Sequence, residues 1–153
     1  MLGVKIKQYV QFVVFSDELE PEEISRRIGL AADRTATRAS RISAPPRPVT
    51  NIWELRSEGA GLTVDEHIAR LVERLRPVRN ALVSLREAPS DVTTRLEVVR
   101  YFNTDDGEDE VIDVTNGLEK LAGQHQLLGW TLTAEVMDFF RDLGANLWVD
   151  EYG

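Results

Sequence analysis

Residues 132–153 constrain the fold more than any other stretch, because they predict a capped helix, a glycine stop and a closing strand. Thr133 can cap the amino end of this helix, and Gly144 suits the residue after its carboxyl end, where glycine adopts a positive φ at little cost. After the glycine, Leu147 and Val149 alternate with other residues as in a strand. A strand near the end of a chain usually pairs inside a sheet, so we expect this strand to be part of the fold. The predicted helix carries an apolar stripe made of Val136, Phe139, Phe140 and Leu143.

The opening stretch predicts a central strand. Residues 4–15 alternate, which divides their apolar side chains between two faces. Apolar groups on both faces are typical of a strand that is covered, at least in part, on two sides. One face would carry Ile6, Val10, Phe12 and Val14, and the other Tyr9, Val13 and Phe15.

A long helix is predicted after the capping box Thr63–Glu66, in which the threonine and the glutamate each satisfy a backbone N–H at the helix start. Apolar residues then follow at helical spacing from Val64 to Leu85. Pro77 interrupts them and predicts a kink or two abutting helices, since proline inside a helix costs about 3 kcal/mol. The stripe also fits a coiled-coil seam, but a helix lying on a sheet is the better interpretation.

The remaining elements complete one domain over residues 1–153. Pro21 opens and Gly29 closes a short helix, strands are expected at 51–57 and 92–102, and an acidic turn at 103–110 precedes a short strand and a helix near 116–126. The order of strands and helices predicts an α+β fold. We expect a two-layer sandwich with about four main strands in one sheet and helices packed on it.

Composition limits the partners and the compartment. The chain has no cysteine, which excludes disulfides, thiolate catalysis and cysteine–zinc sites. The net charge of −8 concentrates in residues 101–153, which carry 12 acidic and 2 basic side chains; this favours solubility or a basic partner. An acidic chain disfavours nucleic acids and anionic membranes, so neither is an expected partner. No apolar run approaches the roughly 20 residues that cross a bilayer, and residues 1–15 contain no signal-peptide cleavage pattern. We expect a soluble, cytoplasmic domain.

No catalytic or metal-binding constellation stands out. His67 and His125 are the two histidines, and they lack the spacing of a zinc pair. The acidic turn fails the calcium-loop pattern, because with Gly107 at its sixth position Phe102 falls at its first ligand position. Glycine patterns of nucleotide-binding loops and serine-hydrolase elbows do not occur. The sequence therefore assigns no catalytic residue and predicts no metal and no cofactor.

The best functional lead is a basic, proline-rich stretch at 31–51, where we expect a long loop. Its arginines could bind phosphate or carboxylate groups, or neutralise the acidic end of the same chain. Aromatic side chains can anchor a partner, although burial in the core is their commoner fate. The candidate binding residues are Arg34, Arg38, Arg41, Arg47, Trp53, Trp148, Asp150 and Tyr152. If Leu147 and Val149 face the core, the last three of these share the opposite sheet face.

Three blocks of the chain resemble a bacterial family, the domain of unknown function 4279. They are the opening strand and helix over residues 9–30, the tryptophan strand Ile52-Trp53-Glu54-Leu55, and the closing strand with its near-terminal Asp150 and Tyr152. The resemblance implies a fold and a bacterial cytosolic setting. It supplies no activity and no catalytic residues.

Two functions remain open from the sequence. The first is a non-enzymatic binding module that holds another protein through the basic loop and the face of Trp148 and Tyr152. The second is a small enzyme or ligand-binder that acts on a phosphorylated or carboxylated small molecule, with Asp150, Tyr152 and the arginines around its pocket. The oligomeric state is not specified by the sequence.

Overall fold

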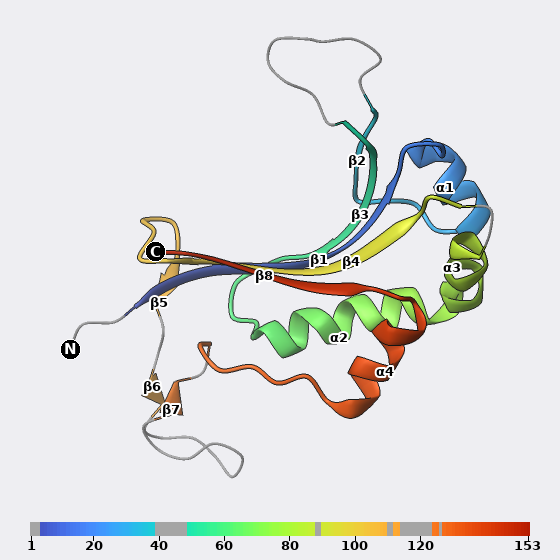
Figure 1. Ribbon diagram of the computed structural model, residues 1–153. Coiled ribbons are helices and arrows are strands. Elements are labelled where there is room, and N and C mark those ends of the chain that lie inside the picture. The colour runs from blue at the N-terminus through green and yellow to red at the C-terminus, as the bar shows by residue number, and fades with distance from the viewer. Residues whose placement is uncertain (1–3, 39–48, 88–89, 110–111, 114–123, 126) are drawn as a thin grey trace.

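The structure is a computed structural model, and it describes residues 4–38, 49–87, 90–109, 112–113, 124–125 and 127–153. Arg41, Arg47 and most of the helix expected at 116–126 lie outside the described residues. The described chain folds as an α+β domain with one open sheet and helices packed against it, which confirms the predicted class (Figure 1).

The sheet is built around β1 (Lys5–Ser16). Two long strands flank it antiparallel, β3 (Asn51–Ser57) on one side and β4 (Thr93–Phe102) on the other. β2 (Arg34–Ala36) extends the sheet beyond β3, and β8 (Asn146–Tyr152) lies parallel to β4 at the opposite edge. The strand order is therefore β2-β3-β1-β4-β8. A short strand, β5 (Glu108–Asp109), pairs with the start of β1. Two more short strands, β6 (Ile112–Asp113) and β7 (Gln124–His125), pair with each other in a separate sheet.

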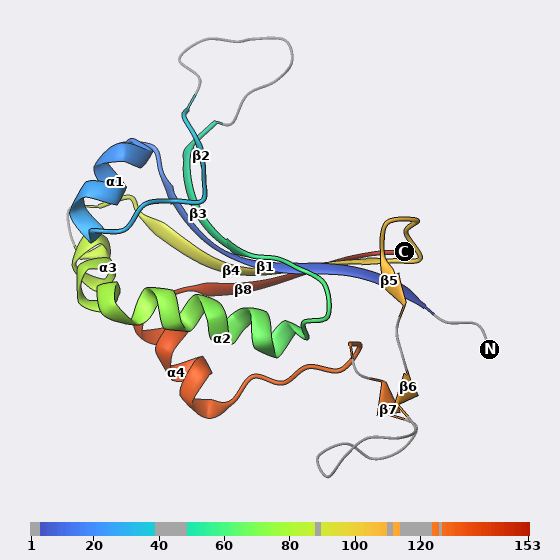
Figure 2. The same cartoon turned by 180° about the vertical axis from the view of Figure 1, so that it is seen from behind.

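The described helices all lie on one side of this sheet, as the two opposite views show (Figures 1 and 2). They are α1 (Pro21–Ile28), α2 (Val64–Leu75), α3 (Arg79–Arg86) and α4 (Ala134–Asp142). A single 3-10 turn, Arg76–Val78, joins α2 to α3 and contains the proline that was expected to interrupt one helix. Since proline has no N–H to donate, the chain forms two abutting helices here, as predicted.

The core lies between the sheet and the helices. In β1, Phe12 faces Leu55 of β3 and Leu96 of β4, and all three side chains are buried. Trp53 is fully buried among them, and its indole Nε1 donates a hydrogen bond of 2.9 Å to Ser25 Oγ of α1. Buried indoles usually need such a partner. Trp53 is therefore not an exposed contact, although it was a candidate binding residue, and it has the buried position that is commoner for aromatic side chains. Its pairing with Val14 of β1 places it on the helix side of the sheet.

The second face of β1 is covered in part, as the sequence predicts, but by neighbouring side chains and not by helices. Tyr9, Val13 and Phe15 point away from the helices, and no described helix covers them. Val13 is nevertheless only 1% exposed. Since the strands on both sides carry long side chains on this face, those neighbours cover Val13 in place of a second layer of helices.

A buried arginine secures the segment that precedes α4. Arg100 lies on the helix side of β4, where its guanidinium donates to the carbonyls of Leu127 and Leu128 and to Gln8 Oε1. It also pairs with Glu151 of β8 at 3.2 Å. These bonds hold the segment before α4 on the sheet, and they use donors that would otherwise be unsatisfied in the core.

Gly144 begins the turn between α4 and β8, and its φ of +65° is expensive for other residues. A Cβ at this position would also overlap the guanidinium of Arg86. That guanidinium is the far end of a flexible side chain and can move aside, so the backbone conformation sets most of the cost. We expect Gly144→Ala to lower the free energy of unfolding by about 1–2 kcal/mol, measured by urea denaturation.

Gly29 provides the matched control, because it ends α1 with a φ of +77° and has open space around its Cα. Gly29→Ala should cost about 1 kcal/mol, the backbone contribution alone. The two losses should therefore be similar. A loss in Gly144→Ala that exceeds the control by more than about 1 kcal/mol would show that Arg86 cannot move aside and restricts the turn.

Candidate functional site

We define the open face as the side chains of the main sheet that point away from the helices. The pairing register sets its members, because directly opposite residues share a face. The open face includes Arg34, Ile52, Glu54, Arg56, Tyr9, Gln11, Val13, Phe15, Arg95, Glu97, Val99, Tyr101, Trp148, Asp150 and Tyr152. These residues come from five strands, so the face exists only in the folded sheet.

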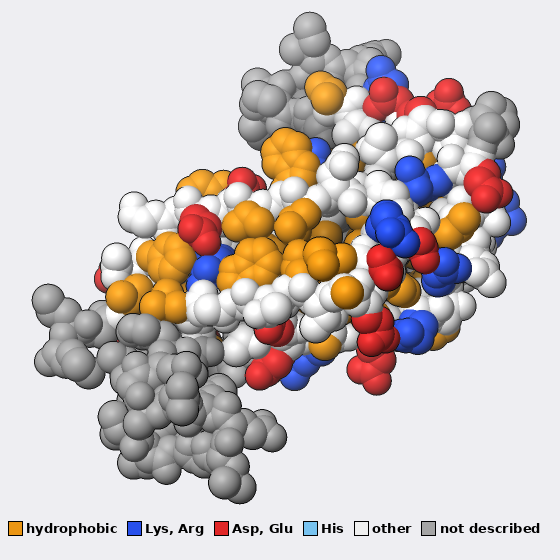
Figure 3. Space-filling model, turned by 60° about the horizontal axis from the view of Figure 1, so that its bottom comes forward, with side chains coloured by type: hydrophobic (Ala, Val, Ile, Leu, Met, Phe, Trp, Pro, Cys, Tyr) orange, Lys and Arg blue, Asp and Glu red, His pale blue; other side chains and the backbone are white. Residues whose placement is uncertain are grey.

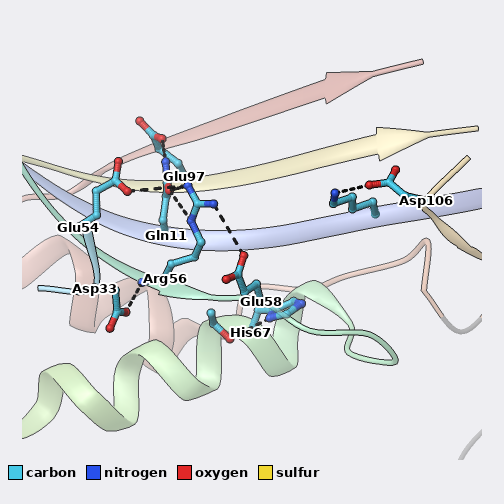
Figure 4. A network of polar contacts seen from close by, with 10 residues as sticks. Gln11, Asp33, Glu54, Arg56, Glu58, His67, Glu97 and Asp106 are labelled. Carbon is cyan, nitrogen blue, oxygen red and sulfur yellow. Dashed lines mark hydrogen bonds and ion pairs between the residues drawn. The ribbon is translucent and has the colours of Figure 1, made fainter. Parts of the chain in front are cut away.

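A hydrogen-bonded network crosses the centre of the open face (Figure 4). Gln11 of β1 lies opposite both Arg56 and Glu97. Arg56 donates to Gln11 Oε1 from Nη2 at 2.9 Å and from Nε at 3.2 Å, and Gln11 Nε2 donates to Glu97 Oε2 at 2.6 Å. Arg95 closes the network with a bond of 2.9 Å from Nη1 to Glu97 Oε1. The amide of Gln11 therefore joins a cation to an anion across three strands.

The network is largely closed to solvent although no described helix covers it. The side chains of Arg56 and Glu97 are 15% and 14% exposed. Glu54 is 18% exposed, and its carboxylate lies 3.8 Å from the Arg56 guanidinium. Burial raises the pKa of Glu54, while the nearby Arg56 and Arg34 oppose this change. Glu54 is therefore the acid of the network whose charge is least well compensated.

Arginine–aromatic stacking makes up the rest of the open face. The Arg95 guanidinium lies 3.8 Å from the Trp148 ring centre and 4.7 Å from that of Phe15, and Arg56 lies 4.1 Å from the ring centre of Tyr9. Such contacts hold both partners in one orientation. At the end of the sheet, two tyrosine rings stack with centroids 5.0 Å apart, Tyr101 of β4 on Tyr152 of β8.

The structure brings some of the predicted site residues together and separates others. Trp148, Asp150 and Tyr152 lie on the open face as expected from strand alternation, and Arg34 lies at its far edge beside Glu54. Arg38 is exposed beyond β2, where its backbone N–H donates to Asn51 Oδ1. The stretch expected as a loop thus contains the short strand β2. Trp53 lies on the helix side of the sheet.

Most residues of the open face were missed from the sequence, among them Gln11, Glu54, Arg56, Arg95 and Glu97 of the network. A signal was present, because Gln11, Glu54 and Glu97 each stand between two apolar residues of a strand. That alternation predicts a polar face, but it does not show which polar residues of different strands meet.

His67 belongs to the core and not to the open face (Figure 4). It lies on α2, and its ring Nδ1 forms a hydrogen bond of 2.8 Å with Ser57 Oγ, while Nε2 has no partner among the described residues. Burial, with a smaller contribution from the positive charge of Arg70, lowers the pKa of His67 to about 4. The histidine is therefore neutral and structural at neutral pH.

This histidine makes stability depend on pH. The unfolded chain binds a proton at His67 below about pH 6.5, whereas the folded chain does so only near pH 4. Stability is therefore complete above pH 6.5 and falls as the pH falls toward 4; the loss attributable to His67 is about 2 kcal/mol at pH 5. His67→Gln should remove this loss, as measured by urea denaturation at pH 8 and pH 5. An unchanged pH dependence in the variant would contradict the assignment.

The network itself should stabilise the sheet. Arg56→Met keeps the aliphatic stem but removes the donors to Gln11 and the charge beside Glu54, so we expect a loss of about 1–3 kcal/mol in urea denaturation. Arg70→Met, at an exposed position on α2, is the matched control and should change stability by less than about 0.5 kcal/mol. Similar values for the two variants would mean that the network is energetically neutral.

Among the described residues, no group of three histidine or acidic side chains could hold a metal ion. None of the helices in this part of the chain is long and apolar enough to span a bilayer.

Comparison with known proteins yields one match. A family model described as "Domain of unknown function (DUF4279)" matches residues 5–153. No curated protein and no solved structure matches the chain significantly.

Proposed function

Because the chain belongs to the DUF4279 family, whose description names no activity, we propose from the geometry that it is a non-enzymatic binding module. The open face of the sheet holds a protein partner. The observation that carries this proposal is the set of aromatic and arginine side chains displayed on a sheet face that no described helix covers.

The composition of the open face suits protein recognition. Arginine, tyrosine and tryptophan are enriched at the centres of protein interfaces, where they contribute most of the binding free energy. Here Arg95 and Trp148 already hold each other by stacking, and Arg56 is held by Gln11 and Tyr9. Side chains that are fixed before binding lose less conformational entropy in the complex, so the face is organised in advance for a partner.

Two observations favour binding over catalysis. A general base must reach its nucleophile or substrate, and His67 lies inside the core with only Ser57 within hydrogen-bond distance among the described residues. Glu54, whose pKa is raised, lies on the sheet face opposite Val13, where its carboxylate is 3.8 Å from the Arg56 guanidinium and so faces a cation of the same chain.

The alternative, binding of a small anionic molecule, gains less support. A cavity of about 350 Å³ at the end of β1 is lined by Glu58, Asp106 and Glu108, and its Lys7 is already paired with Asp106. Acidic walls repel phosphate and carboxylate groups. A second cavity of about 450 Å³, between β8 and α4, is lined mainly by apolar side chains. A panel of nucleotides and organic acids should therefore leave the melting temperature unchanged.

The proposal is tested by affinity capture from a lysate of the source cells. The bait is the purified domain, and the test variant combines Arg34→Glu with Tyr9→Ala, two changes on the open face away from β8. Partners captured by the wild type should be lost with this variant. Arg70→Glu, an exposed reversal on the helix side, is the control and should keep them. Partners retained by the open-face variant would contradict the proposed surface.

A further inference from the structure

The edge strand β8 exposes an unusual amount of apolar surface. It ends the strand order, so no described strand pairs with its outer edge. Its side chains Leu147, Trp148, Val149 and Tyr152 are between 42% and 51% exposed. These four make up most of the large exposed hydrophobic side chains of the described chain. Leu147 and Val149 lie on the helix side of the sheet, and Trp148 and Tyr152 on the open face.

The two edges of the sheet differ in how they are protected. β2, at the other edge, has three residues and includes the charged Arg34. β8 has seven residues, and its charged side chains, Asp150 and Glu151, follow a run at 146–149 that has no charge and no proline. Proteins usually protect a free edge with charged side chains, with proline or with a very short strand, because an exposed apolar edge pairs with other chains. The edge of β8 therefore has the properties of a strand that is paired in the working protein.

The apolar surface continues from β8 onto α4. Leu147 lines the cavity between them together with Leu132, Met137 and Phe140, and Met137 is itself 51% exposed. Figure 3, in which the side of the molecule with β8 and α4 is turned toward the viewer, shows hydrophobic side chains gathered in its middle. A partner strand beside β8 would cover this surface on one face and extend the open face on the other.

We propose that the occupant is a second copy of this chain, whose β8 pairs antiparallel with the first across a two-fold axis at Trp148. This register places Leu147 opposite Val149 of the second copy, and Trp148 opposite its own counterpart. Asn146 lies opposite Asp150 of the second copy. An isologous contact needs only one self-complementary strand, and it uses up both free edges at once.

The side chains of β8 select this register. Asp150 makes no ion pair or hydrogen bond with a side chain of the described residues, and an opposite asparagine amide gives its carboxylate a donor. An axis at Val149 would instead place the apolar Trp148 and Leu147 opposite the carboxylates Asp150 and Glu151. An axis at Asp150 would bring two carboxylates together, which is destabilising in directly opposite positions. The axis at Trp148 pairs apolar with apolar residues and leaves no like charges opposed.

The dimer has a consequence for the shape of the protein. A two-fold axis normal to the sheet keeps both sets of helices on one side, so the two open faces join into one surface. The dimer does not depend on the proposed binding function, since its contacts are made by the edge of β8.

The absence of cysteine allows a direct test of the register. Directly opposite residues of an antiparallel pair have Cα atoms about 4.5–5.5 Å apart, within the span of a disulfide. Trp148→Cys should therefore give a covalent dimer on mild oxidation. Val149→Cys is the matched control, because its two copies would be diagonal neighbours about 7–8 Å apart, too far to bridge.

A second measurement addresses the dimer itself. Sedimentation equilibrium should show that the wild type is a dimer at micromolar concentration and that the Leu147→Lys/Val149→Lys variant is a monomer. Circular dichroism should show that this variant is still folded. Ala69→Lys, at an exposed site on α2, should remain a dimer. A monomeric wild type, a dimer that tolerates the two lysines, or cross-linking through Val149→Cys in place of Trp148→Cys would each overturn the proposal.

Discussion

The pairing of β1 on both of its sides is the constraint on which the rest of the structure depends. β1 binds β3 along one edge and β4 along the other, and its twelve residues span the full length of the sheet. Because side chains alternate along a strand, this one register decides for three strands which residues meet the helices and which do not. A shift of one residue would place Phe12 on the open face and Gln11 in the core.

The described helices pack on the apolar face of the sheet, and none of them covers the opposite face. A sheet with one uncovered face must satisfy its polar side chains within the face or with water. Here Gln11 connects Arg56 to Glu97, and the arginines lie over aromatic rings. The same contacts that stabilise the sheet therefore also prepare a rigid surface of aromatic and charged groups, which is the basis of the proposed binding function.

The local elements of this fold could be predicted from the sequence, and the long-range ones could not. The cap at Thr133, the turn at Gly144 and the break at Pro77 depend on residues close in the chain, and all three are found as expected. The network depends on Gln11, Arg56 and Glu97, which lie on three strands far apart in the sequence. Which strands become neighbours is decided by the packing of the whole sheet. The burial of Trp53 follows from that packing as well, since the alternation of β3 leaves either face open to it.

Hydroxyl-radical footprinting of the free protein distinguishes a sheet with one open face from a sheet that is covered on both faces, because aromatic rings lie on each of them. We expect rapid oxidation of Tyr101 and Tyr152, on the open face, and strong protection of Phe12 and Trp53, on the helix face. Equal protection of the two pairs would show that the open face is covered in the free protein, and would contradict this arrangement of helices and sheet.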